Sequence, residues 1–308
     1  MNSSNTATCI ETVARLRSIS AAAEALGISQ PALSSRIKKV ETQLGAQLFD
    51  RSRTPLSITD AGRAYLETQQ GIEALSRRLA QRISDMQNLK SGKLVVGGAS
   101  LFNSTLLPAA LARFSELYPG IEVRVVTDTV PNLTQAALDG AVDLFITPVP
   151  NDNLNLESEK LLTEKLFLCL AKSSPLTQKL PSMGAQGYAR IGENEFKLLA
   201  SEPFILLNPT LQLGRKLRQL FELHGVTPAH SVVVDQTSTG FALSMAGSGV
   251  CMIAESAVKD APRAETAALY LADEDICSRD LYIARLKSSS RSKAEEEFAR
   301  ILKESVRQ

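Results

Sequence analysis

Small polar and basic side chains share one face of a predicted helix in the segment QPALSSRIKKVETQLG, residues 30–45. At 100° per residue, four apolar residues fall within about 60° of one another: Leu33, Ile37, Val40 and Leu44. The opposite side carries Pro31, Ser34, Ser35, Lys38, Lys39 and Thr42. Hydroxyls and the Gln30 amide suit base edges, and lysines suit phosphates. The pattern predicts a DNA recognition helix; an ordinary amphipathic helix with a solvated face is the alternative.

A basic turn follows this helix at residues 51–55, between two short extended pieces. Arg51 and Arg53 in this turn are placed to lie along phosphates or in a minor groove. The turn therefore predicts a wing beside the recognition helix. A surface loop that is basic for no functional reason is the alternative.

The elements before residue 30 complete a helix-turn-helix. Residues 6–17 show helical apolar spacing, and a short alanine-rich helix follows with Ser18 or Ser20 as its N-cap. Gly27 ends that helix, since glycine tolerates left-handed backbone. Ser29 then caps the recognition helix, whose first turn holds Pro31. These caps and the turn glycine predict a helix, a tight turn and a second helix.

Motifs of enzyme chemistry are missing from the sequence. It has no GxSxG elbow, P-loop, GxGxxG run or metal-ligand spacing. Cys169 and Cys251 lie in apolar runs and are predicted to be buried thiols, with a redox-sensing pair as the alternative. We therefore expect no cofactor and no metal, and an enzyme that uses the α/β region is the disfavoured reading.

The length of 308 residues suits two or three compact units, and 44% hydrophobic and 22% charged residues are typical of a globular protein. Residues 1–92 hold 12 Lys and Arg against 8 Asp and Glu, and the remainder is slightly acidic. A basic front end fits nucleic-acid binding by that part alone. No apolar run is long enough to span a membrane and no secretion signal precedes the first helix, so a cytoplasmic location is expected.

Residues 61–90 contain no proline and carry an apolar seam, which predicts one long helix that pairs with a second copy. Packing on its own chain is the alternative. From Lys93 onward, short buried strands alternate with helices, which indicates an α/β region with a parallel sheet.

Polar residues follow several of these predicted strands, where ligands of open α/β sheets bind. Each is also of a type that caps helices or forms turns. The candidates for binding a small-molecule effector are Ser100, Phe102, Asn103, Thr129, Thr147, Asn208, Thr237 and Ser238.

The first sixty residues resemble the LysR-type transcriptional regulators. The resemblance rests on Ala22-Ala23, Ser29 to Ser34, Ile37, Glu41 to Gly45, Leu48-Phe49, Arg51 and Thr59 to Gly62. It implies that Gln30, Pro31 and Ser34 face DNA. The chain departs from the family at Ser35, where Arg is frequent; Arg36 follows and is expected to touch a phosphate or a carboxylate. It also departs at Arg17, where a turn glycine is frequent, and at Leu101, where a Ser or Thr is common.

The resemblance also implies an architecture. The fold class is α+β: a winged helix-turn-helix (1–62), a linker and dimerisation helix (63–92), and a two-lobed, periplasmic-binding-protein-like effector domain (93–308). Lobe one is expected at 93–163 and 270–308, and lobe two at 165–268. The expected function is a sequence-specific transcriptional regulator of double-stranded DNA, controlled by an effector between the lobes. The expected assembly is a homodimer or homotetramer, with RNA polymerase as a candidate partner. A DNA-binding protein without effector response is the alternative.

Overall fold

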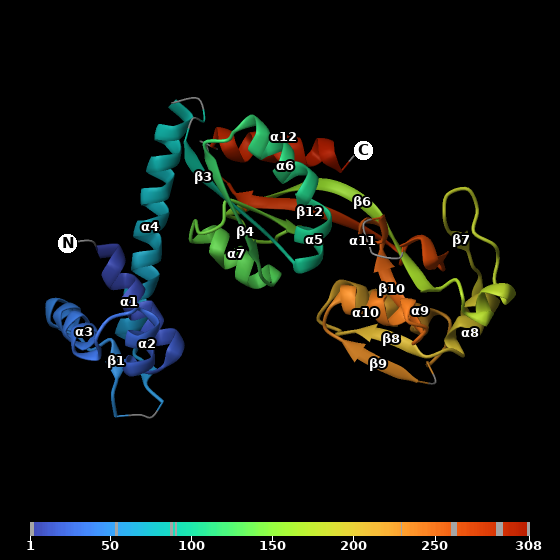
Figure 1. The fold of residues 1–308 in the computed structure, drawn as a ribbon, viewed down its shortest axis with the longest axis horizontal. Helices are drawn as coiled ribbons and strands as arrows, with labels where there is room; N and C mark the ends of the chain where they lie inside the picture. The colour runs from blue at the N-terminus through green and yellow to red at the C-terminus, as the bar shows by residue number, and fades with distance from the viewer. Residues whose placement is uncertain are drawn as a thin grey trace. The chain divides into compact units, whose positions relative to one another are not determined.

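The computed structural model describes residues 3–52, 55–86, 89, 91–228, 230–259, 264–287 and 292–306. It divides into two compact units: residues 1–86 form most of the first, and residues from 87 onward form most of the second. Each unit has its own hydrophobic core. Figure 1 shows their elements.

The N-terminal unit is a three-helix cluster with a two-stranded hairpin and a long helix. Its elements are α1 (Ser3–Leu16), α2 (Ile19–Ala25), α3 (Gln30–Leu44), β1 (Phe49–Asp50), β2 (Ser57–Ile58) and α4 (Asp60–Met86). The predicted caps are present, since the hydroxyls of Ser18 and Ser29 accept the backbone N–H groups of Ala21 and Ala32. The helix-turn-helix and the hairpin are therefore confirmed.

The core of this unit contains Leu33, Ile37 and Val40 of α3, as predicted. The prediction that Leu44 is also buried is wrong, because its side chain is 52% exposed. Leu44 is the last residue of α3, and Gly45 then turns the chain with φ +67°. Leu48 and Phe49, after the turn, fill the core instead.

The link between α1 and α2 holds a left-handed residue that is not glycine. Arg17 has φ +51°, a conformation that costs an L-residue about 1–2 kcal/mol. Its carbonyl accepts the N–H of Leu56 at 3.1 Å, and its Nε donates to the Leu56 carbonyl at 3.3 Å. The positive φ explains the turn glycine that the resemblance places here, and the arginine side chain adds one hydrogen bond to the base of the hairpin.

The C-terminal unit contains two α/β lobes (Figure 1). The first lobe has strand order β4-β3-β5-β12-β6, with β3, β4 and β5 parallel and β12 antiparallel to β5 and β6. Its strands are β3 (Gly92–Gly98), β4 (Ile121–Thr127), β5 (Leu144–Thr147), β12 (Ser278–Leu286) and the first part of β6 (Leu156–Ala171). Its helices are α5 (Ser100–Thr105), α6 (Leu107–Leu117), α7 (Val130–Leu138) and α12 (Lys293–Ser305).

The second lobe continues the same sheet as β6-β10-β8-β9, and β11 pairs with both β6 and β7. Its further strands are β7 (Ala189–Arg190), β8 (Phe204–Leu207), β9 (Ser231–Val234), β10 (Val250–Ala254) and β11 (Ala267–Leu271). Its helices are α8 (Glu193–Ala200), α9 (Gln212–Leu223), α10 (Thr237–Met245) and α11 (Glu255–Lys259), with short 3-10 turns η1 (Pro175–Lys179) and η2 (Ala264–Thr266).

The chain crosses between the lobes twice. It passes into the second lobe within β6, where pairing with β12 ends at Lys165 and pairing with β10 begins at Leu166. It returns between Leu271 and Ser278, because all of β11 pairs within the second lobe. The second lobe therefore extends past residue 268, where the sequence placed its end.

Helix α4 begins in close contact with the hairpin. A Cβ atom added at Gly62 would lie 2.3 Å from the Leu48 carbonyl oxygen and 2.6 Å from Cγ1 of Ile58. The hydroxyl of Thr59 accepts the Gly62 N–H at 3.0 Å and donates to the Gln47 carbonyl at 2.7 Å. Only glycine fits where the helix meets the backbone of the preceding turn.

Replacing Gly62 by alanine is expected to destabilise the N-terminal unit by about 1–3 kcal/mol, because the added methyl overlaps a backbone atom that has no room to move. The matched control is Gly71→Ala in the same helix, where an added Cβ meets nothing within 4 Å. It should stabilise the helix by about 1 kcal/mol. Calorimetric unfolding of the full chain measures both, and equal shifts for the two variants would contradict the close approach.

Candidate DNA-binding surface and effector site

The predicted recognition face lies on the outside of α3. Gln30, Pro31 and Ser35 are exposed, as are Lys38 and Lys39. Ser34 is half-buried, at the edge between this face and the core. The buried stripe on the other side of the helix holds these side chains outward, so polar groups and two ammonium groups present a continuous surface.

Arg36 lies away from this surface. Its Nη1 is 3.7 Å from the Sγ of Cys9 on α1. The guanidinium therefore packs along the neighbouring helix, as its position about 100° around α3 from Ser35 suggests.

The wing is the β1–β2 hairpin, in which Phe49 pairs with Ile58 and Asp50 with Ser57. Arg51 follows β1, and its Nη2 lies 3.0 Å from Oε2 of Glu41 on α3. The other oxygen of Glu41 accepts the N–H of Leu48 at 2.9 Å. Arg53 lies outside the described residues. Glu41 is thus a positioning residue that the sequence analysis missed, although its place in the Glu-x-x-Leu-Gly step was a signal.

The effector candidates of the first lobe differ in how free their side chains are. Ser100 is exposed at the start of α5, and Phe102 is buried beneath a guanidinium. The Asn103 amide nitrogen donates to the Gly98 and Val126 carbonyls and to the Thr127 hydroxyl, which ties β3 to β4. Its amide nitrogen is therefore engaged in holding the strand ends.

Two further candidates follow β4 and β5. Thr129 is exposed before α7. Thr147 is completely buried at the end of β5, and its hydroxyl donates to the Val149 carbonyl at 2.9 Å. Thr147 therefore shapes the loop after β5.

The candidates of the second lobe follow β8 and β9. Asn208 accepts the N–H and hydroxyl of Thr210 through Oδ1, and its amide donates to Asp235 at 3.1 Å. Thr237 and Ser238 form the first turn of α10, half-buried and exposed respectively. Asn208 thus links the two strand ends, while the α10 hydroxyls are more accessible.

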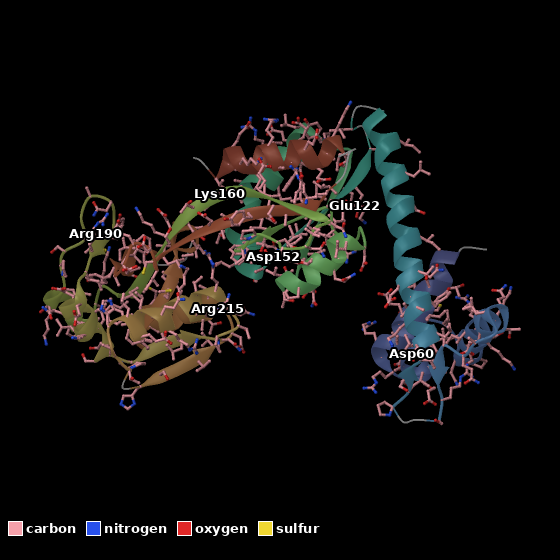
Figure 2. All side chains as sticks on the ribbon, turned by 180° about the vertical axis from the view of Figure 1, so that it is seen from behind. Asp60, Glu122, Asp152, Lys160, Arg190 and Arg215 are labelled. Carbon is pink, nitrogen blue, oxygen red and sulfur yellow. The ribbon has the colours of Figure 1, made fainter. Side chains whose placement is uncertain are left out.

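The structure places three polar residues at the lobe junction that the sequence analysis did not identify. Arg279 of β12 is buried over the Phe102 ring, 5.2 Å from its centroid, and its Nε donates to Glu164 at 2.7 Å. Gln212, at the start of α9, donates to the Pro148 carbonyl of the first lobe at 3.3 Å. Lys216 lies one turn further along α9, and its ammonium donates to the Ile276 carbonyl at 2.7 Å. The labelled Arg215 shows the position of α9 in Figure 2.

Burial perturbs the two cations at this junction. It lowers the pKa of the Arg279 guanidinium, and the Glu164 carboxylate opposes that change. Burial also lowers the pKa of Lys216, and the positive charge of Arg279 lowers it further. The junction therefore combines an aromatic ring, a buried guanidinium, a partly buried ammonium, and the carboxylates of Glu164 and Asp273, which act on Arg279 and Lys216 respectively.

The cysteines are buried free thiols, as predicted for Cys169 and Cys251. These two are cross-strand partners on β6 and β10. Hydrogen bonding to Cys251 and burial raise the pKa of Cys169 well above its usual value, which disfavours a reactive thiolate.

Within the described residues, no group of His, Cys, Asp and Glu side chains is arranged to hold a metal ion. None of the described helices combines the length and the apolar character needed to cross a bilayer.

Two family models match the chain. The one described as "Bacterial regulatory helix-turn-helix protein, lysR family" matches residues 5–63, and the one described as "LysR substrate binding domain" matches residues 87–307.

Full-length relatives are similar across nearly the whole chain. An uncharacterized HTH-type transcriptional regulator, YcgK of Bacillus subtilis (strain 168), is 29% identical over 306 residues, which cover 96% of this chain and 92% of the relative. A probable RuBisCO transcriptional regulator of Trieres chinensis is 26% identical over 295 residues, covering 94% and 92%.

Solved structures share the fold. CbnR, a LysR family transcriptional regulator, has a TM-score of 0.71 at 19% identity, covering 98% of each chain. Full-length CbnR in complex with its target DNA has a TM-score of 0.70 at 20% identity, covering 98% of this chain and 99% of the other. Because the matched models span both units, the chain belongs to the LysR family: it is a DNA-binding transcriptional regulator with a helix-turn-helix and a two-lobed effector-binding domain.

Proposed function

We propose that α3 enters the major groove and reads sequence with Gln30, Pro31, Ser34 and Ser35, while Lys38 and Lys39 bind flanking phosphates. The exposed polar face of a capped helix carries this proposal. Gln30, on the first turn, can donate to and accept from one base edge. Arg36, Arg51 and Arg53 are proposed to contribute contacts to the DNA backbone. CbnR has been captured in complex with its target DNA, which supports the same use of this fold.

The proposed effector site lies at the lobe junction. The candidates with accessible polar groups are Ser100, Thr129, Asn208, Thr237 and Ser238. Phe102 is buried beneath Arg279 and is proposed to support the site, and we add Gln212, Lys216 and Arg279. Asn103 and Thr147 support the site by holding strand ends in place. The Lys216 ammonium and the Arg279 guanidinium, partly offset by Asp273 and Glu164, support an effector with an anionic group. The structure of a BenM effector-binding domain with its effector benzoate supports effector binding by this fold.

Helix α4 is proposed to join two copies of the chain. Ile72, Leu79 and Ile83 are exposed by 48%, 61% and 47%, and they fall within about 40° of one another around the helix. An exposed apolar seam of this kind is buried by a partner helix. Dimers joined in this way hold two recognition helices at a fixed spacing, and further pairing of dimers gives a tetramer.

The proposed location is the cytoplasm, where a regulator of this kind meets its DNA. The proposed protein partner is RNA polymerase, through which the regulator would change transcription. We propose no catalytic activity. Of the two histidines, His224 stacks on Phe196 with ring centroids 4.4 Å apart, which suits a packing role. A regulator that lacks an effector response is the second candidate, and an effector screen separates the two.

Recognition by α3 is tested by selecting duplexes from a random pool and measuring binding by fluorescence anisotropy. Gln30→Ala should reduce discrimination between the selected duplex and its single-base variants by about 1–3 kcal/mol. Lys39→Ala should instead weaken all duplexes alike and lower the slope of log K against log salt by about 0.9. Unchanged discrimination in Gln30→Ala would argue against this recognition face.

The effector site is tested by thermal unfolding of the full chain with a panel of metabolites that contains carboxylates and their amides. An anionic binder at 100 times its Kd should stabilise the chain by about 2.7 kcal/mol. It should also change affinity for the selected duplex by roughly 5- to 150-fold. Lys216→Gln should abolish both effects. Lys172→Gln is the matched control, because Lys172 also donates to a backbone carbonyl, that of Glu265. Stabilisation by the amides alone would contradict an anionic effector.

Self-association through α4 is tested by Leu79→Glu, which places a charge in the proposed seam. The variant should sediment as a smaller species than the wild type in analytical ultracentrifugation, because burial of a carboxylate between apolar helices is unfavourable. Leu79→Met keeps the apolar surface and should retain the wild-type mass. An unchanged mass for Leu79→Glu would place the interface elsewhere.

A further inference from the structure

A carboxylate lies between the proposed recognition helix and the wing. Glu41, on α3, has a side chain that is only 11% exposed, whereas that of its partner Arg51 is 47% exposed. Oε1 of Glu41 accepts the Leu48 N–H at 2.9 Å, and Oε2 lies 3.0 Å from Nη2 of Arg51. One carboxylate oxygen thus accepts a backbone hydrogen bond at the start of the wing, and the other pairs with the wing arginine.

The pairing of Arg51 with Glu41 weakens the sequence-independent attraction of the wing to DNA phosphates. A cation gains affinity for a duplex by replacing counterions condensed on the phosphates. An arginine already paired with a carboxylate must first lose that pair, and the bare carboxylate then repels the same phosphates. Arg51 therefore contributes little to binding of a duplex that docks loosely.

We propose that Glu41 is a specificity-determining residue, which withholds Arg51 from the phosphates of arbitrary DNA. This inference rests on the proposed docking of α3 in the major groove. When α3 is fully seated, a phosphate held beside the wing competes for the exposed guanidinium at short range. Glu41 keeps the Leu48 N–H when Arg51 turns to the phosphate, so its carboxylate stays partly compensated. Loose docking lacks the fixed phosphate, and Arg51 stays with Glu41.

The substitution Glu41→Gln separates the two tasks of this side chain. The amide oxygen still accepts the Leu48 N–H, while the negative charge beside Arg51 is gone. The probe is a random-sequence duplex, titrated at several salt concentrations by fluorescence anisotropy with the full chain. Affinity should rise about three- to tenfold, and the slope of log K against log salt should steepen by about 0.9, the value of one additional phosphate contact.

A double-substitution cycle tests whether the gain passes through Arg51. Arg51→Gln alone should lower the affinity for random duplex less than twofold, because the arginine is neutralised in the wild type. In the Glu41→Gln background, Arg51→Gln should remove the whole gain. For a duplex selected by the wild type, Glu41→Gln should raise affinity less than twofold, so the ratio of specific to random binding falls.

Two comparisons keep the test interpretable. Glu24→Gln on α2 makes the same change in net charge at an exposed position; a gain equal to that of Glu41→Gln would overturn the proposal in favour of a general charge effect. Weaker binding by Glu41→Gln at an unchanged thermal midpoint would also overturn it, since Glu41 would then only support the wing. If Glu41→Gln unfolds, a large loss of random-duplex affinity in Arg51→Gln alone overturns it. Failure of the wild type to bind any duplex would instead refute the proposed function.

Discussion

The outward face of α3 depends on the burial of its inward face. Leu33 and Ile37 are completely buried against a core that includes Ile10 of α1 and Ala22 of α2. Burying each such side chain contributes about 1.5–3 kcal/mol, whereas burying the lysines and serines of the opposite face would be unfavourable. The rotation of the helix about its axis is therefore set by the core, and the identity of the residues at the surface is left free for contact with DNA.

Backbone contacts then fix the wing to this helix. Arg17 forms hydrogen bonds with both the N–H and the carbonyl of Leu56, and Glu41 accepts the Leu48 N–H. Gly62 allows the Leu48 carbonyl to approach closer than any side chain would permit. These contacts join α1, α3 and α4 to the two ends of the hairpin. The base of the wing is thus fixed by these contacts, which place Arg51 beside Glu41 of α3.

The sequence predicted what local rules determine. Helix caps at Ser18 and Ser29, the stripe of α3 and most buried strands follow from residue types at fixed spacing. Leu44 was wrongly predicted because periodicity does not show where the core ends. The first part of β6 was missed because LESEKLLTEK mixes charged and apolar residues, and its pairing with β12 joins segments more than a hundred residues apart.

The site was less predictable than the fold for the same reason. The exposed groups of α3 could be placed by angle on one helix. The ion pair between Arg51 and Glu41 could not be predicted, because residue spacing does not show where the turn after β1 lies relative to α3. Arg279 and Glu164 are separated by 115 positions, and neither lies at the end of a parallel strand, where the effector candidates were predicted.

The Arg279–Glu164 pair gives the lobe junction a physical basis for responding to a ligand. Glu164 lies where β6 leaves the first lobe, and its second oxygen accepts the N–H of Ser256 on α11 in the second lobe. Arg279 in turn covers Phe102 of the first lobe. Removing one partner of such a buried pair is costly, roughly 3–5 kcal/mol, so Glu164 is one of the groups that link the two lobes. An anion bound beside Arg279 would compete with Glu164 for the guanidinium. The contact that an anion at the junction would disturb is therefore also one that links the two lobes.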